Sequence, residues 1–161
     1  MTEPGAVVIV GVDGSQNARA ALRWAATEAQ LRGATLELVH AWQFPAVAIV
    51  AYGPTVVPVF DAADLEKRAW QIAEAAAAEV RSESPGLDVR VSVTRGHPAE
   101  VLVDAAQQAG LLVVGSRGLG GFARLLMGST SQHCVHHASC PVVVVPSPID
   151  EGHEEPRLAP C

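Results

Sequence analysis

The chain has 161 residues, of which 49% are hydrophobic and 17% charged, so it is long enough for one domain with a buried core. The formal net charge of −6 does not favour binding to nucleic acid or to an anionic membrane, so any phosphate recognition must be local. The N-terminus lacks the features of a signal peptide, and no apolar run approaches the roughly 20 residues that span a bilayer. We therefore expect a cytoplasmic protein that binds neither nucleic acid nor membrane.

The first part of the chain alternates strand and helix patterns. Ala6–Val12 is a continuous apolar run, typical of a strand covered on both faces. A helix is expected to begin after Ser15, a good N-cap residue, and to end at Gly33. Thr35–Ala41 then reads as a second strand, and Asp61–Glu83 as a helix rich in good helix formers.

The connection Trp42–Phe60 is too apolar for an ordinary linker. Two interpretations remain open for it. It is either a loop folded over the flank of the domain, or a mobile flap over a ligand or an oligomer contact.

The rest of the chain continues the alternation. Period-two alternation over Asp88–Thr94 predicts a strand with one polar face, near a sheet edge. The remaining expected elements are a helix over His97–Gly110, a buried strand over Leu111–Gly115, a helix from Gly128 or Ser129 to about His137, and a last strand over Cys140–Val145. Five strands alternating with four helices predict a parallel α/β sheet with helices on both faces. We expect residues 1–146 to form the single domain and the acidic, proline-rich residues 147–161 a poorly ordered tail.

Cysteine and histidine residues gather near the end of the expected domain. Three cysteines are an odd number in a chain that is not small and loop-rich, which argues against a disulfide framework. Cys134 and Cys140 lie near three histidines, but their spacing matches no usual zinc pattern. We do not expect a metal centre there.

Ligands of such sheets lie beyond the carboxyl ends of the strands, where the strand order reverses. Two of these ends carry suggestive residues: "GVDGS" after the first strand and "GSRG" after the fourth. If these two strands are neighbours, the two segments meet in one crevice.

The stretch "VVGSRGLGGFARLLMGST", Val113–Thr130, favours phosphate binding. It has no lysine for a Walker loop, and "GLGGFA" matches the dinucleotide fingerprint only weakly because it follows the fourth strand. Gly115 and Gly118 would let the backbone come close to a ligand, and Arg117 between them could donate to phosphate. Gly128, Ser129 and Thr130 open a helix whose free N–H groups suit an anion. The alternative is that the glycines serve only tight turns and a helix cap.

Asp13 lies at the end of a buried strand, where a carboxylate needs partners. It could cap the following helix. It could instead accept hydrogen bonds from ribose hydroxyls or an adenine amine, or help hold a divalent cation with the phosphates. Bare phosphate would repel it, so we favour the nucleoside or a bridging metal ion.

Several segments together resemble the universal stress protein family. They are "VIVGVDGS", "LELVHAW", "GHPAEVLVDAA" and above all the pattern of Gly115, two residues, Gly118, nine residues, then Gly128 and Ser129. The resemblance covers roughly Ala6 to Val145. The spaced glycine motif is typical of the ATP-binding branch of that family.

The resemblance implies an open five-stranded sheet in the order 3-2-1-4-5, of the Rossmann-like, adenine nucleotide alpha hydrolase-like class. It implies ATP, ADP or AMP in the crevice, with Mg²⁺ or Mn²⁺ as the accompanying metal and Asp13 as a candidate ligand of it. Gly11 and Val12 would line the floor of the crevice, and Asp13 would bind the ribose or adenine side. The backbone near Ala41 would recognise the adenine edge. The phosphates would be held by Gly115, Arg117, Gly118, Gly128, Ser129 and Thr130. Family members commonly dimerise through the last strand, here Pro141–Val145, which implies a homodimer.

Three functions fit these observations. The first is a nucleotide-dependent regulatory module of the stress response, whose ATP occupancy an unknown protein partner reads. The second is a slow ATPase or autokinase, but no catalytic base is identifiable, and His40 within its strand reads as a core or pocket-wall residue. The third is a nucleotide-free dimeric scaffold, which would leave Arg117 and the glycine spacing without a use.

Overall fold

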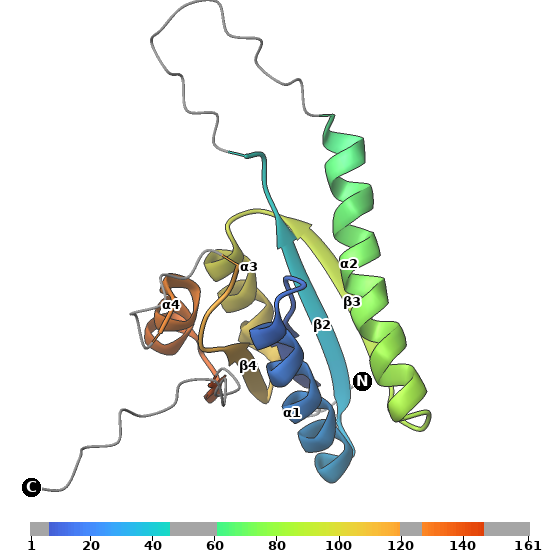
Figure 1. The fold of residues 1–161 in the computed structure, drawn as a ribbon. Coiled ribbons are helices and arrows are strands. Elements are labelled where there is room, and N and C mark those ends of the chain that lie inside the picture. Colours follow the sequence, from blue (N-terminus) through green and yellow to red (C-terminus); the bar gives the residue numbers. More distant parts are fainter. Residues whose placement is uncertain (1–6, 46–60, 120–126, 147–161) are drawn as a thin grey trace, which may run out of the picture.

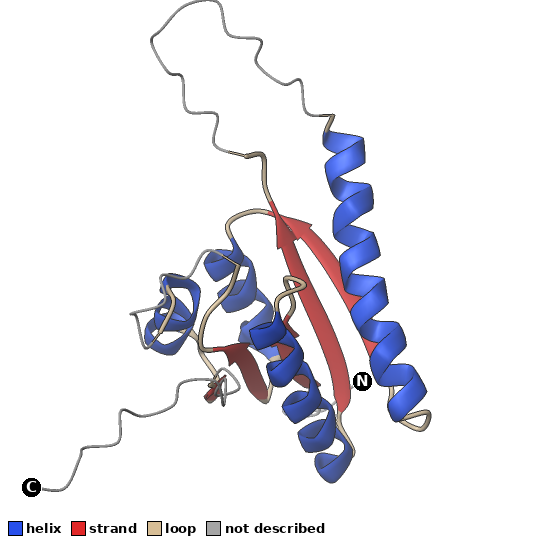
Figure 2. Ribbon diagram, in the orientation of Figure 1, coloured by secondary structure: helices blue, strands red, loops and turns tan. Residues whose placement is uncertain are grey.

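A computed structural model describes residues 7–45, 61–119 and 127–146, and these form one parallel five-stranded sheet with the order β3-β2-β1-β4-β5. The strands are β1 (Val7–Gly11), β2 (Thr35–Trp42), β3 (Val89–Arg95), β4 (Leu111–Gly115) and β5 (Val142–Val145). Figure 2 shows the strands as one twisted layer between helices. The expected strand order is confirmed, and β3 lies at an edge as its alternating pattern predicted.

Helices cover both faces of the sheet, as predicted (Figure 1). They are α1 (Gln16–Arg32), α2 (Ala62–Glu83), α3 (Pro98–Ala105), extended by a short 3-10 turn (Ala106–Gln108), and α4 (Ser129–His137). α1 and α2 pack on one face, and α3 and α4 pack on the other. None of the helices in the described part of the chain is long and apolar enough to cross a membrane.

The central strand β1 contributes to two separate cores, one on each face of the sheet, because its side chains alternate between the faces. In β1, Val8 and Val10 enter the core under α1 and α2, whereas Ile9 enters the core under α3 and α4. This two-sided burial explains why the sequence of β1 is continuously apolar.

The first helix begins and ends where its sequence predicted. The Ser15 side chain accepts a hydrogen bond from the Ala18 N–H, which satisfies one unpaired donor of the first turn. Gly33 closes α1 with a left-handed conformation, φ 61°, and its N–H bonds back to the helix carbonyls.

The last strand and the third helix are shorter than predicted. β5 begins at Val142, two residues after Cys140, although pairing with β4 already includes the Pro141 carbonyl. α3 ends at Ala105 and tightens into the 3-10 turn before reaching Gly110. The described residues of the Trp42–Phe60 connection end at Pro45, so its two interpretations, like the predicted tail at 147–161, lie outside the described residues.

α2 approaches the sheet through small side chains. Ala69, Ala73 and Ala77 recur every four residues and are each no more than 2% exposed. A stripe of alanines lets the helix axis lie close to the strands beneath it. Figure 1 shows the first turns of α2 extending past the arrowheads of β2 and β3, beside the carboxyl edge of the sheet.

Candidate functional site

The carboxyl ends of β1 and β4 lie side by side, because the two strands pair in parallel with Val10 opposite Val113. β1 leads to α1 on one face and β4 leads toward α4 on the other, so this is the point where the strand order reverses. The segments that follow these strands therefore meet, as the sequence predicted for neighbouring first and fourth strands.

A cavity of about 740 Å³ opens at this edge of the sheet. All the site residues predicted from the sequence line it: Gly11, Val12, Asp13, Ala41, Gly115, Arg117, Gly118, Gly128, Ser129 and Thr130. They come from the ends of β1, β2 and β4 and from the start of α4. Its volume falls within the range of small-molecule sites.

Asp13 connects the two halves of the cavity. Its Oδ1 accepts a hydrogen bond from the Ser15 N–H at 2.9 Å, just before α1. Its Oδ2 accepts one from the Leu119 N–H at 3.2 Å, in the segment after β4. The capping interpretation is wrong in its detail, because Ser15 and not Asp13 caps α1. A carboxylate accepts about four hydrogen bonds, so Asp13 keeps acceptor capacity for a ligand.

Close contacts limit the space for a side chain at two glycines, Gly115 at the end of β4 and Gly118 in the segment after it. A Cβ built on Gly115 would lie 2.9 Å from the carbonyl oxygen of Asn17, in the first turn of α1. A Cβ on Gly118 would lie 2.9 Å from Asp13 Oδ2. The contact at Gly115 is between β4 and α1 and concerns the fold, whereas the contact at Gly118 lies within the candidate site.

The start of α4 is attached to the end of β4. The Gly128 N–H donates to the Ser116 carbonyl at 2.7 Å, and the buried Ser131 hydroxyl bonds to the Gly115 carbonyl at 2.8 Å. These bonds bring the Gly115–Gly118 and Gly128–Thr130 segments together. The N-cap residue Gly128 has no side chain with which to cap α4, and the start of the helix lines the cavity, so the positive end of its dipole lies there.

His40 is a buried wall of the cavity, which confirms its interpretation as a core or pocket-wall residue. Its Nδ1 lies 2.7 Å from the Val12 carbonyl oxygen, and it must donate a proton because a carbonyl only accepts. This bond joins β2 to the loop after β1 and fixes the imidazole orientation.

Other lining residues were not predicted as site residues. The apolar ones include Ile72 from α2 and Leu102 from α3, and Trp42 and Gln43 come from the end of β2. Ile72 is 37% exposed and lies on a helix that the sequence predicted only from its good helix formers. The local sequence could not predict Ile72 as a lining residue, because its position at the cavity depends on how α2 packs against the loop after β1.

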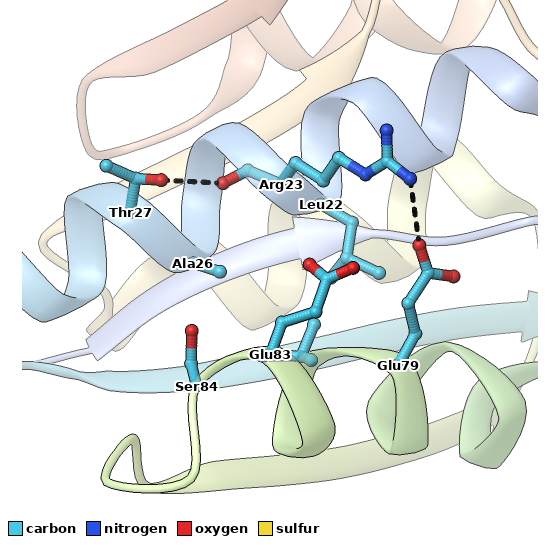
Figure 3. A pocket seen from close by; sticks show the side chains of 8 residues that line it. Leu22, Arg23, Ala26, Thr27, Glu79, Glu83 and Ser84 are labelled. Atoms are coloured by element: carbon cyan, nitrogen blue, oxygen red, sulfur yellow. Dashed lines mark hydrogen bonds and ion pairs between the residues drawn. The ribbon is translucent and has the colours of Figure 1, made fainter.

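A second hollow lies between α1 and α2 and contains none of the predicted site residues (Figure 3). It measures about 180 Å³. At its rim Arg23 forms an ion pair with Glu79 at 3.3 Å, and the Thr27 hydroxyl donates to the Arg23 carbonyl. The hollow is small, and the polar groups at its rim bond to one another. We therefore interpret it as a packing groove between two helices.

The cysteine and histidine residues near the end of the domain lie along α4 and, for Cys140, in the turn that follows it. The His133 and His137 rings lie 4.3 Å apart between centroids, but no group of three or more metal-binding side chains gathers anywhere in the described parts of the chain. Cys134 is fully buried in the core, and burial raises the pKa of its thiol to about 11. A protonated buried thiol packs as a small apolar group.

An open parallel sheet with a cavity at the switch point, lined by the start of a helix, defines the class of Rossmann-like ligand-binding domains. A model of the universal stress protein family matches residues 6–146. The chain belongs to that family.

Relatives of this chain occur in several bacteria. A universal stress protein from Mycolicibacterium smegmatis is 38% identical over 148 residues, which cover 91% of this chain and 50% of the relative. One from Thermus aquaticus is 36% identical over 140 residues, covering 86% of this chain and 96% of the relative. This chain spans about half the length of several mycobacterial relatives that it matches.

Solved structures have the same fold. A universal stress protein in complex with cAMP is 25% identical, with a TM-score of 0.65, covering 91% of this chain and all of that one. A universal stress protein from Lactobacillus plantarum, 24% identical with a TM-score of 0.66, covers 87% of this chain and 97% of that one.

Proposed function

We propose that this protein binds an adenine nucleotide, ATP or its products ADP and AMP, in the cavity beyond β1 and β4, and that occupancy regulates its contact with a protein partner. The observation that carries the proposal is the convergence of three distant segments on one cavity of about 740 Å³. The 25% identical structure in complex with cAMP supports the same ligand class.

The phosphate groups would lie against the start of α4. Its N–H groups around Gly128, Ser129 and Thr130 line the cavity and suit an anion. The backbone after β4, with Arg117 and Gly118, closes the other side. Positive potential here is local, which reconciles phosphate binding with a net charge of −6.

The nucleoside would extend toward β2. The remaining acceptor capacity of Asp13 matches the donor character of ribose hydroxyls, and the backbone at Ala41 is available to an adenine edge. Asp13 is the one carboxylate among the described residues that line the cavity. A Mg²⁺ or Mn²⁺ ion would therefore be held chiefly by the nucleotide phosphates, with Asp13 as its single protein carboxylate.

A direct experiment is to denature freshly purified protein and identify released nucleotide by mass spectrometry, then measure ATP, AMP and adenosine affinities by calorimetry. Asp13→Ala should weaken all three ligands by on the order of 10-fold, because it removes a charged acceptor from the nucleoside side. Gly118→Val should also weaken all three ligands, because its Cβ would lie 2.9 Å from Asp13 Oδ2 and displace the carboxylate on the nucleoside side. Absence of any nucleotide binding by the unaltered protein at millimolar concentration would overturn the proposal. Conversion of bound ATP to ADP over hours would instead favour an ATPase.

The proposed regulatory unit is a homodimer formed through the last strand. β5 is an edge of the sheet and consists of four valines, Val142–Val145. An apolar edge strand is a ready pairing surface for a second copy of the same strand.

A further inference from the structure

Trp42 lies at the base end of the proposed nucleotide cavity. It follows Ala41 at the end of β2 and lines the cavity. It is two residues beyond His40, so both side chains leave β2 on the same face of the sheet. Ile72 lines the cavity from α2, which packs on that face. Large apolar side chains therefore surround the region that a base would enter.

The indole of Trp42 is held by neighbours outside the cavity lining. The Arg95 guanidinium carbon lies over the ring, 5.9 Å from its centroid, and Arg95 is the residue opposite Trp42 in the pairing of β2 with β3. Phe44 contacts the indole edge to face, with ring centroids 6.1 Å apart, and the same guanidinium lies 4.6 Å from the Phe44 ring. All three distances are in the range of favourable aromatic and cation–π contacts.

The backbone adds to this support. The Trp42 carbonyl accepts a hydrogen bond from the Gly96 N–H at 2.9 Å, which ties the end of β2 to the turn after β3. The indole itself is only partly buried. Arg95 and Phe44 thus fix the ring while it keeps accessible surface at the cavity.

We propose that Trp42 is a base-stacking residue that gives the cavity a preference for purine over pyrimidine nucleotides, and that Arg95 is a positioning residue for its ring. This inference rests on the proposed nucleotide binding. A purine offers two fused rings to the indole, whereas a pyrimidine offers one, so the stacking contribution discriminates between them. Aromatic side chains stack on every base, so stacking alone does not select one particular base. The preference that we propose depends only on the size of the stacked ring system.

The test compares AMP with CMP by calorimetry in four proteins. The unaltered protein should bind AMP more tightly than CMP. Trp42→Ala should weaken AMP binding by on the order of 10-fold and reduce the ratio of AMP to CMP affinity, whereas Trp42→Phe should keep most of both. Trp70→Ala is the control, because Trp70 is a tryptophan, 40% exposed, that does not line the cavity.

Fluorescence gives a second readout. The chain has three tryptophans, so a Trp24→Phe, Trp70→Phe variant leaves Trp42 as the only emitter. AMP should quench its emission. Adding Arg95→Ala should shift the emission maximum before any ligand is added and should weaken AMP binding less than Trp42→Ala does.

The outcomes separate the two proposals. If the unaltered protein binds neither nucleotide, the proposed function fails. If it binds AMP and Trp42→Ala leaves both AMP affinity and the AMP to CMP ratio unchanged, nucleotide binding stands and the stacking role is overturned. A lowered urea midpoint of Trp42→Ala with unchanged affinities would likewise overturn it, since the cluster would then only stabilise the ends of β2 and β3.

Discussion

Gly115 has no room for a side chain, because the contacting atoms belong to the backbone of α1. The Cβ position lies 2.9 Å from the Asn17 carbonyl oxygen and 3.0 Å from its carbon. Gly115→Ala should therefore separate β4 from the first turn of α1 and lower the free energy of unfolding by about 1–3 kcal/mol. Urea unfolding followed by circular dichroism measures the loss.

Gly128→Ser is the matched control for that variant. At Gly128 the nearest atom to a Cβ is the Arg117 Cα at 3.5 Å, an ordinary contact, and φ is −77°. Serine is also a better N-cap than glycine. Its free energy of unfolding should stay within about 0.5 kcal/mol of the unaltered protein. Equal losses for the two variants would contradict the steric explanation.

The two described cysteines should differ in reactivity. Burial raises the pKa of the Cys134 thiol to about 11, and burial also raises the pKa of Cys140, which is only partly buried. In a Cys161→Ser variant at pH 8, iodoacetamide should alkylate Cys140 at least about 10-fold faster than Cys134, because the buried thiol is both protonated and inaccessible. Peptide mass spectrometry distinguishes the sites, and the difference should vanish in urea. Equal rates in the folded protein would show that Cys134 is exposed by local opening.

The raised pKa of Cys134 also sets a dependence of stability on pH. The unfolded thiol loses its proton near 9.0, whereas the folded one keeps it to about 11. The contribution is therefore fully present below pH 9 and is lost as the pH rises from 9 to 11. In Cys134→Ala the decline over this interval should be smaller. A parallel decline in both proteins would assign the alkaline loss to other groups.

Residue types predicted much of the site, and contacts between distant elements account for the rest. Gly118 and Asp13 were both identified from sequence, each for its own reason. That a Cβ on Gly118 would lie against Asp13 Oδ2 could not be predicted, since the contact depends on the pairing of β1 with β4. The bond between His40 and the Val12 carbonyl depends in the same way on the pairing of β1 with β2.

At the scale of elements, α2 is held by close packing. Ala73 is fully buried in the alanine stripe that faces the sheet. Ala73→Leu would insert three carbon atoms where no space exists, so it should lower the free energy of unfolding by about 1–3 kcal/mol or more. Urea unfolding measures this loss.

The ion pairs between α1 and α2 provide the comparison. Glu79 lies 3.3 Å from Arg23 and 3.7 Å from Arg19, but both arginine side chains are about two-thirds exposed, at 65% and 64%. Exposed pairs contribute little, so Glu79→Gln should cost less than about 1 kcal/mol. A larger cost for Glu79→Gln than for Ala73→Leu would show that charge, not packing, joins these helices.

The fold was more predictable than the ends of its elements. Ser15 and Gly33 each carry a local signal, so the limits of α1 were predictable. β5 was predicted to start at Cys140, but a strand is defined by pairing with its neighbour, and its own apolar residues do not fix the register. α3 was predicted to reach Gly110, whereas it tightens at Ala106, which is fully buried against the sheet. Tertiary packing decided both limits.

At the scale of the whole molecule, the backbone of β5 determines how a second copy could pair with it. The Leu112 N–H donates to the Pro141 carbonyl, and the Ser116 N–H donates to the Val145 carbonyl. Alternate residues of a strand direct their backbone groups to opposite sides, so Val142 and Val144 direct theirs away from β4. These are the groups that an added strand would use.

Val144→Pro therefore separates the proposed dimer contact from the fold. Proline removes the outward N–H of Val144 and leaves the bonds between β4 and β5, a position that edge strands tolerate. We expect the unaltered protein to sediment as a dimer and Val144→Pro as a monomer. Val144→Thr, which keeps the N–H and the branched side chain, should remain dimeric. If Val144→Pro sediments with the unaltered protein as a dimer while its circular dichroism is unchanged, the two copies meet elsewhere. A monomeric unaltered protein at tens of micromolar, with or without ATP, would refute the dimer itself.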